Sequence, residues 1–156
     1  MNSQSAQRLF DSIDQTIGDV DGISGSSILV DSFLAKFLVV YICGIYEEII
    51  ENILIDFTKR NTSRDEVVKY ITKSVDVSFR NPDFNKIISL IKNLDNPIWT
   101  AELGNMRSSA GIALDNIVTN RNGIAHGQSI TITLGDIKQY YKSSRPFIEK
   151  IDSLLI

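Results

Sequence analysis

The feature that most constrains the fold of this chain is a long segment without proline, Ile28–Arg60, in which apolar residues dominate. Between Phe33 and Tyr46, apolar positions placed on a helix cover nearly the whole circumference. A helix that is apolar on all sides is buried centrally, either among neighbouring helices or against a second subunit. The segment therefore predicts one long central helix. Gly44, near its middle, either permits close approach of another helix or is a tolerated weak point.

Helix start signals recur along the rest of the chain, and no stretch alternates polar and apolar residues as a strand does. Ser63–Glu66 reads as a capping box, and Thr133–Asp136 as a looser version of one. Asn81 and Asn96 each precede a proline suited to the first turn of a helix. These signals predict an all-α fold with helices over Ser3–Gly18, Ile28–Arg60, Ser63–Val75, Asp83–Leu94, Ser109–His126 and Gly135–Leu155.

Two interruptions are expected within this pattern. Gly22–Ser27 is a short flexible joint between the first two helices. Pro146, after Ser144 and Arg145, is expected to kink or break the last helix.

The composition fits one soluble globular domain over residues 1–156, with 43% hydrophobic and 22% charged residues. A net charge of −3 argues against a general nucleic-acid coat but allows a focused basic groove. One cysteine and one histidine are too few for an internal disulfide or a zinc site, so no metal and no cofactor are expected. Cys43 lies in an apolar run and is interpreted as a small buried hydrophobe.

The chain is expected to be cytoplasmic and not to contact a membrane. Its first residues lack the basic and apolar regions of a signal peptide. The longest apolar stretch, Phe37–Tyr46, is bounded by Lys36 and Glu47 and is shorter than the ~20 residues of a membrane span.

The only histidine, His126, lies in the segment Arg121-Asn122-Gly123-Ile124-Ala125-His126-Gly127. On a helix, Asn122 and His126 share a face, and the long stem of Arg121 carries its guanidinium to the same patch. Ile117, Arg121 and Ile124 recur at a spacing that brings the arginine to the edge of the buried stripe. Gly127 suits the position just after a helix, so His126 is expected near a helix C-terminus, where a cation is favoured, or in the turn that follows.

These residue types suit cleavage of a phosphodiester by the 2′-hydroxyl of RNA. That reaction needs a base, an acid and positive charge at phosphorus. His126 can serve as base or acid, Arg121 can hold the phosphate oxygens, and Asn122 can orient either group. One histidine cannot be base and acid at the same moment, so a two-fold dimer would supply the missing group.

Two further sets of charged residues have open interpretations. Glu47, Glu48 and Glu51 interrupt the apolar run and are either a solvated face or include one acid that points at the site. Lys138, Lys142 and Arg145 form a basic stripe on the last helix, either solvated or a track for a phosphate backbone.

The string RNGIAHG resembles the signature of the HEPN family of helical domains, in which an arginine and a polar residue precede a histidine. Arg121, Asn122 and His126 match the functional positions of that motif. The stretch SFLAKFLVVYICGIYEEIIENIL is similar to the stand-alone bacterial groups named RiboL-PSP and MAE-type.

The resemblance implies an up-and-down helical bundle, a homodimer, and metal-independent endoribonuclease activity on RNA. It also implies a toxin or phage-defence effector held in check by an antitoxin, such as a minimal nucleotidyltransferase. In many such proteins an acid of the long helix supports the site, for which Glu48, or failing that Glu47, is the candidate.

Two other readings of the segment stay open. The chain could be a non-catalytic helical module that docks a partner protein or a nucleotide, with Arg121 and His126 as a structural hydrogen-bonding pair. Alternatively, His126 is a satisfied residue at a helix end without a functional role.

Overall fold

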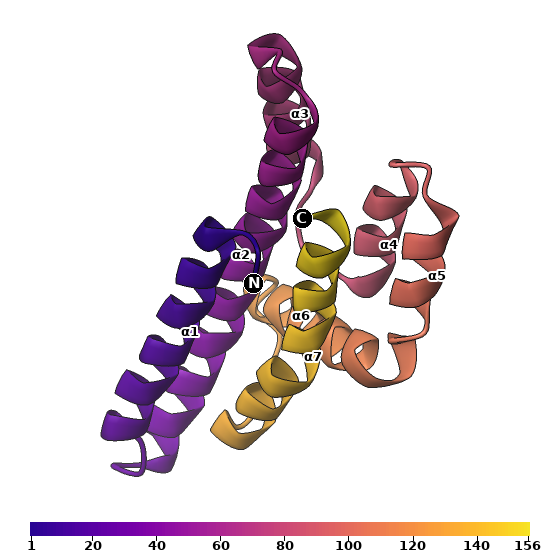
Figure 1. Cartoon of the computed structure of the whole chain (residues 1–156). Helices are drawn as coiled ribbons and strands as arrows, with labels where there is room; N and C mark the ends of the chain where they lie inside the picture. Colours follow the sequence, from indigo (N-terminus) through magenta and orange to yellow (C-terminus); the bar gives the residue numbers. More distant parts are fainter.

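The fold is built from helices connected by short turns (Figure 1). The computed structural model describes the backbone of residues 1–156 and the side chains of all residues except 76–78. Its elements in chain order are α1 (Gln4–Ile23), α2 (Ile28–Asn61), α3 (Asp65–Ser78), α4 (Phe84–Lys92), α5 (Pro97–Gly104), a π-helical turn (Arg107–Gly111), α6 (Ile112–Ala125) and α7 (Leu134–Leu155). No β-strand occurs in this backbone, so the predicted all-α class is confirmed.

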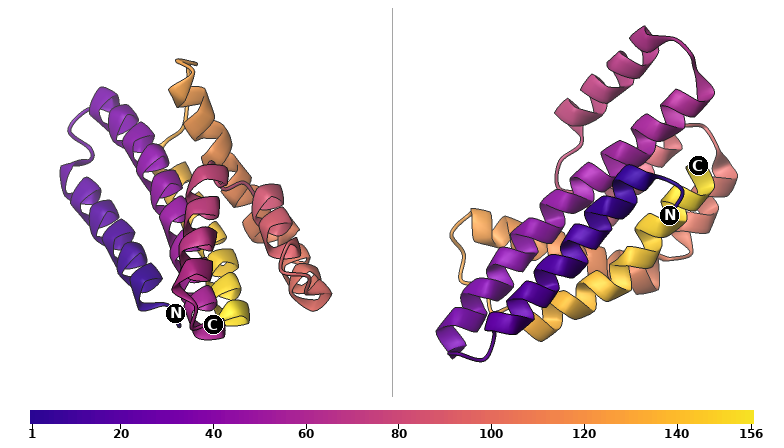
Figure 2. Two further views of the ribbon diagram at one scale, coloured as in Figure 1. Left: turned by 90° about the horizontal axis from the view of Figure 1, so that it is seen from above. Right: turned by 60° about the vertical axis from the view of Figure 1, so that its left-hand side comes forward.

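α2 is the central helix of the bundle, as its apolar run predicted. It packs against α1, α3, α6 and α7, and the two views of Figure 2 show these helices around it. Its buried side chains, which make up a large part of the core, are Ala35, Leu38, Val39, Ile42, Cys43, Tyr46, Ile49, Ile50, Ile53 and Leu54.

α2 is also the one helix of the described residues that is long and apolar enough to cross a membrane by length and composition. The core helix of a soluble protein meets the same criteria, because both must be apolar over many turns. The many α2 side chains in the core make the fold compatible with a soluble protein.

Two predicted start signals are confirmed. Thr133 and Asp136 form a reciprocal capping box at the start of α7: the Thr133 hydroxyl accepts from the Asp136 N–H, and the Asp136 carboxylate accepts from the Thr133 N–H. The Asn96 side chain accepts from the N–H groups of Ile98 and Trp99. It begins α5, a helix of eight residues that was not among the predicted segments.

The other two start signals are wrong in detail. Ser63 does not cap α3. The residue before that helix is Arg64, whose N–H donates to the Thr62 hydroxyl. Asn81 lies in the left-handed region with φ +54°, in the reversal between α3 and α4, and Asp83 caps α4 instead. Asparagine adopts this conformation more readily than most residues, so the turn conformation, rather than a capping role, explains the asparagine at position 81.

The expected break at Pro146 does not occur, because α7 continues through it to Leu155. Proline removes one backbone hydrogen bond from the helix. Pro146 itself is exposed, whereas Ser144, Phe147 and Ile148 are fully buried around it. Core packing on both sides of the proline therefore keeps the helix continuous.

The two ends of the chain are joined through a buried carboxylate. Asp152, only 1% exposed, accepts hydrogen bonds from the backbone N–H groups of Asn2 and Ser3. The Ser3 hydroxyl donates to Asp56 of α2 at 2.7 Å, and the Arg60 guanidinium donates to the carbonyl of Ile156 at 3.0 Å. We call this group of contacts the terminal clasp.

Candidate functional site

The Arg121–Gly127 segment forms the end of α6 and the turn that follows it. His126 is the last residue of the helical turn, and Gly127 adopts φ +68°. The N–H of Gln128 donates to the carbonyl of Gly123 at 2.9 Å, and the N–H of Gly127 to that of Ile124 at 3.1 Å. These two bonds define a Schellman motif, which confirms the predicted role of Gly127.

Gly123 is required for the close packing of this turn. A Cβ at this position would lie 2.4 Å from Cδ1 of Ile130 and 3.1 Å from Oε1 of Gln128. Ile130 packs against the core, and its side chain lies directly against the backbone of Gly123.

We expect Gly123→Ala to lower the free energy of unfolding by about 1–3 kcal/mol, because Ile130 must be displaced from the core. Denaturant unfolding would measure it. Gly18→Ala, in the middle of α1 with no atom near the new Cβ, is the matched control and is expected to stabilise by about 0.5–1 kcal/mol. Equal effects of the two substitutions would contradict the packing argument.

The three motif side chains differ in exposure. Arg121 and Asn122 are half-buried, and Nη1 of Arg121 approaches Oδ1 of Asn122 at 3.4 Å. The His126 side chain is exposed and makes no hydrogen bond or ion pair within the described residues. Arg121 is thus held at the edge of the core, as predicted, while the imidazole faces solvent.

Arg121 lies within electrostatic range of the middle of α2. Burial raises the pKa of the Cys43 thiol to about 12, and the negative charge of Glu47 raises this pKa further. The positive charges of Arg121 and Lys86 act in the opposite direction on the same thiol. α2, α4 and α6 therefore bring one acid and two cations together around the buried Cys43.

Glu47 is fixed by the loop between α3 and α4. Its carboxylate accepts from the N–H of Asn81 at 2.6 Å and pairs with Arg80 at 3.8 Å. Lys86 Nζ donates to the carbonyls of Arg80 and Asn81, which ties the loop to α4. No local pattern points to Arg80 or Lys86, because only the tertiary fold brings Arg80 to Glu47 and Lys86 to the carbonyls of this loop.

Glu47 and Glu48 face different surroundings, since adjacent helical residues differ by 100° around the axis. Glu47 is half-buried and shares the surroundings of Arg121, whereas Glu48 is exposed. Glu51 is partly buried and has a partner. A role for Glu48 in the site stays a prediction, and the geometry favours its alternative, Glu47.

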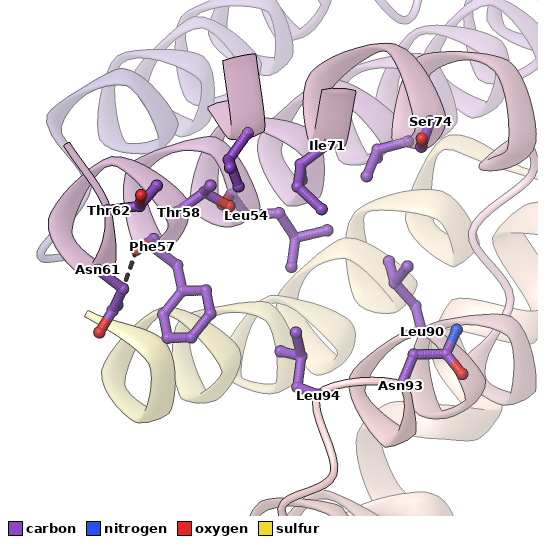
Figure 3. A pocket seen from close by; sticks show the side chains of 12 residues that line it. Leu54, Phe57, Thr58, Asn61, Thr62, Ile71, Ser74, Leu90, Asn93 and Leu94 are labelled. Atoms are coloured by element: carbon purple, nitrogen blue, oxygen red, sulfur yellow. Dashed lines mark hydrogen bonds between the residues drawn. The ribbon is translucent and has the colours of Figure 1, made fainter. Parts of the chain in front are cut away.

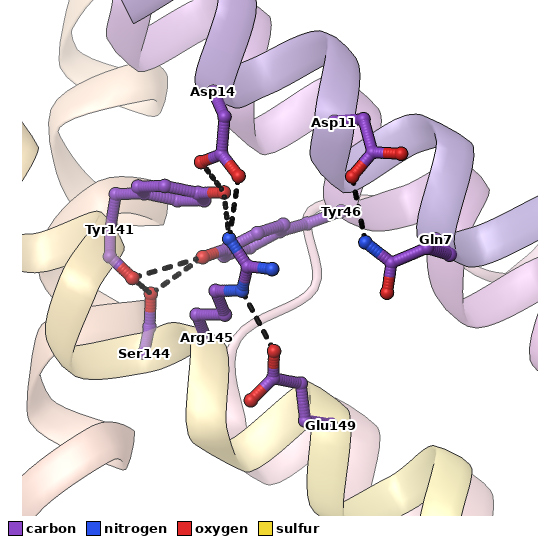
Figure 4. Close-up of polar contacts among 8 residues, drawn as sticks. All are labelled: Gln7, Asp11, Asp14, Tyr46, Tyr141, Ser144, Arg145 and Glu149. Atoms are coloured by element: carbon purple, nitrogen blue, oxygen red, sulfur yellow. Dashed lines mark hydrogen bonds and ion pairs between the residues drawn. The ribbon is translucent and has the colours of Figure 1, made fainter. Parts of the chain in front are cut away.

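Two cations of the basic stripe, Arg145 and Lys138, form ion pairs with α1, and Figure 4 shows the pair of Arg145 with Asp14. Arg145 pairs with Asp14 and Glu149, each at 2.8 Å, and lies over the Phe10 ring at 4.6 Å. Lys138 pairs with Asp21, and Lys142 is exposed. These pairs direct two of the three cations toward α1, whereas the motif lies on α6, so RNA binding by the stripe stays a prediction.

An exposed apolar surface runs along the N-terminal half of α2. It consists of Leu29, Phe33, Phe37 and Val40, which are 67%, 62%, 49% and 46% exposed. Their spacing places them on one face of the helix, and we call this face the α2 strip. A Cβ at Gly44, in line with the strip, would meet no atom within 4 Å.

Within the described side chains, no group of three or more His, Cys, Asp and Glu residues is arranged to hold a metal ion.

The helical bundle, with an Arg–Asn…His motif at the end of one helix, is that of a HEPN domain. The family model described as RiboL-PSP-HEPN matches residues 2–156. The chain therefore belongs to the RiboL-PSP-HEPN family. Neither the curated proteins nor the solved structures contain a match.

Proposed function

We propose that this protein is a homodimeric, metal-independent endoribonuclease in which Arg121 and His126 act on the scissile phosphate. The observation that carries the proposal is the position of the only histidine. Its exposed imidazole lies at the end of α6, one turn after the half-buried Arg121. Family membership supports an action on RNA or on a nucleotide.

In the proposed reaction, the 2′-hydroxyl of RNA attacks the adjacent phosphorus and the bond from phosphorus to the 5′-oxygen breaks. A base takes the proton of the 2′-hydroxyl, and an acid gives a proton to the departing 5′-oxygen, which leaves a 2′,3′-cyclic phosphate. His126 provides one of these groups because an imidazole can act as a general base or a general acid. Arg121 binds the phosphate oxygens, and Asn122, 3.4 Å from it, positions the guanidinium.

Glu47 is proposed to support Arg121 electrostatically from α2. Both charges act on the Cys43 thiol, so both lie near it. The Asn81 N–H and Arg80 fix the Glu47 carboxylate in this position. A negative charge held in a fixed position is proposed to act electrostatically on the guanidinium before the substrate binds.

A second copy of the chain is proposed to supply the other proton-transfer group. The α2 strip favours this partner, because four large apolar side chains on one face are costly to leave in water. Gly44, open to solvent in line with the strip, would let a second helix approach closely. In a two-fold dimer the same strip serves both subunits.

The α2 strip also favours a second candidate function. A non-catalytic module would use the same apolar face to dock a different protein, such as a nucleotidyltransferase. Under that function the exposed imidazole has no reaction to serve, so the two candidates differ in whether RNA is cleaved.

The test is cleavage of single-stranded RNA by the purified protein in EDTA. We expect fragments that end in a 2′,3′-cyclic phosphate, since the mechanism uses only side chains and the RNA's own hydroxyl. Product ends analysed by mass spectrometry would show this. A folded, dimeric protein that leaves RNA intact, or products that end in a 3′-hydroxyl, would overturn the proposal.

As a toxin or defence effector, the protein is proposed to act inside the bacterial cell and to be restrained by an antitoxin partner. Growth of a bacterial host that expresses the chain alone would be the first measurement of this role.

A further inference from the structure

A cavity of about 480 Å³ lies beneath α3, at the opposite part of α2 from the α2 strip (Figure 3). Its walls come from the C-terminal end of α2, the inner face of α3 and the end of α4. Among the described residues, α3 packs extensively only on α2, so the cavity occupies the space between α3 and α4. The residues that line it include Leu54, Phe57, Asn61, Val75, Leu90 and Asn93.

The lining defines the chemistry of a ligand. None of the described residues that line the cavity carries a charge, and its walls are mainly aliphatic with one aromatic ring, Phe57. The Asn61 amide donates to the carbonyl of Phe57 at 2.8 Å, which leaves its side-chain oxygen able to accept. The side-chain amide of Asn93 has no hydrogen-bond partner within the described residues. Apolar walls with a few such polar groups, and a volume within about 300–1,000 Å³, are typical of small-molecule sites.

The wall of the cavity is continuous with the loop that fixes Glu47. Val75 lines the cavity, and Phe79, just after α3, is buried. The next two residues are Arg80 and Asn81, whose contacts hold the Glu47 carboxylate. A shift of α3 would therefore move Arg80 and Asn81, the residues of the loop that hold Glu47.

We propose that this cavity binds an uncharged, mainly apolar small molecule, and that the bound molecule stabilises the loop that holds Glu47. The cavity exists in the arrangement in which Arg80 and Asn81 contact Glu47. A ligand that binds only this arrangement increases its population. An effect of the ligand on the catalytic site rests on the proposed function, because Glu47 is the acid proposed to support Arg121.

Binding is measured with phenylnaphthylamine, an uncharged apolar probe whose emission rises in an apolar site. Trp99, the only tryptophan, packs edge-on against Phe57 at 6.0 Å between ring centroids. In the wild type, energy transfer from Trp99 to the probe would therefore report binding at this cavity. Variants that add a tryptophan are compared with the wild type by direct excitation of the probe. The sulfonated analogue of the probe, of similar shape but negatively charged, is expected to bind at least about tenfold more weakly.

Matched variants test whether the probe binds in this cavity. Leu90→Trp fills it, and Asn93→Asp puts a charge at its exposed mouth, so each is expected to weaken binding about tenfold or more. Ile98→Trp, on the exposed side of α5 and outside the lining, is the control and is expected to bind like wild type. Asn93→Asp keeps the test valid if Leu90→Trp does not fold.

The effect on the Glu47 loop is measured by labelling Cys43, the only cysteine, with a small thiol reagent. Cys43 is 1% exposed, so labelling requires local opening. At a probe concentration ten times its Kd, labelling is expected to slow about tenfold if opening empties the cavity. Unchanged or faster labelling would overturn the inference, and so would binding by both Leu90→Trp and Asn93→Asp that is as tight as binding by the wild type. Neither readout uses RNA, so a protein that binds the probe but cleaves no RNA overturns only the proposed function.

Discussion

Replacement of His126 by alanine is expected to lower the rate of RNA cleavage by about a thousandfold, because loss of a positioned acid or base costs about 10²–10⁴ in rate. The exposed imidazole makes no contact with the described residues that could stabilise the fold. The variant should therefore melt like wild type. Single-turnover cleavage of a fluorescent RNA would measure the rate.

Arg121→Ala is expected to cause a loss of similar size, since it removes the positive charge at phosphorus. Arg121→Lys keeps the charge but loses the two-pronged geometry of the guanidinium, so an intermediate rate is expected. The carboxylate of Glu47 retains its contacts with Arg80 and Asn81 in both variants, which should preserve the fold.

Ser129→Ala, an exposed position three residues after His126, is the matched control and is expected to cleave at the wild-type rate. In a bacterial host, the wild type and Ser129→Ala should arrest growth, whereas His126→Ala should be tolerated. Cleavage by His126→Ala at the wild-type rate would remove the histidine from the mechanism.

Phe37→Glu is expected to convert the proposed dimer into a monomer by weakening association about a hundredfold or more. A charge at the centre of an apolar interface loses its hydration without gaining a partner. Phe37 is 49% exposed in the single chain and stacks on Tyr41 at 5.7 Å, so the monomer should stay folded. Sedimentation velocity would measure the mass. The rate of RNA cleavage should fall in parallel with the fraction of dimer if the second subunit supplies a catalytic group.

Ile98→Glu is the control for this substitution, because Ile98 is 67% exposed on α5, away from the α2 strip. It should leave both mass and activity unchanged. A wild type that sediments as a monomer would contradict the dimer. Association of the wild type with lipid vesicles, lost in Phe37→Glu, would assign the strip to a membrane instead.

The elements that the sequence predicted well are those whose signals are local. The apolar run of α2 and the reciprocal Thr133–Asp136 box depend only on neighbouring residues, and both were confirmed. α5 is only eight residues long, so it carries too few apolar repeats to be recognised beyond its Asn96 cap. The break expected at Pro146 does not occur, because core packing, which a sequence does not display, holds α7 together.

The same distinction applies to the site. Arg121, Asn122 and His126 lie within one turn and a half of helix, so their pattern was visible in the sequence. The choice between Glu47 and Glu48 depends on the rotation of α2 relative to α6, which only the packed structure fixes. Arg80 pairs with Glu47, and Lys86 of α4 binds the carbonyls of Arg80 and Asn81, so no spacing rule could have connected these residues.

The terminal clasp has a consequence for synthesis of the protein. The carboxylate of Asp152 receives the N–H groups of Asn2 and Ser3, a contact that spans 150 positions of the chain. Contacts this distant in sequence are among the last that a growing chain can form. On the ribosome, the contacts of Asn2 and Ser3 with Asp152 can therefore form only after α7 has left the exit tunnel, although the Ser3 hydroxyl can cap α1 locally before then.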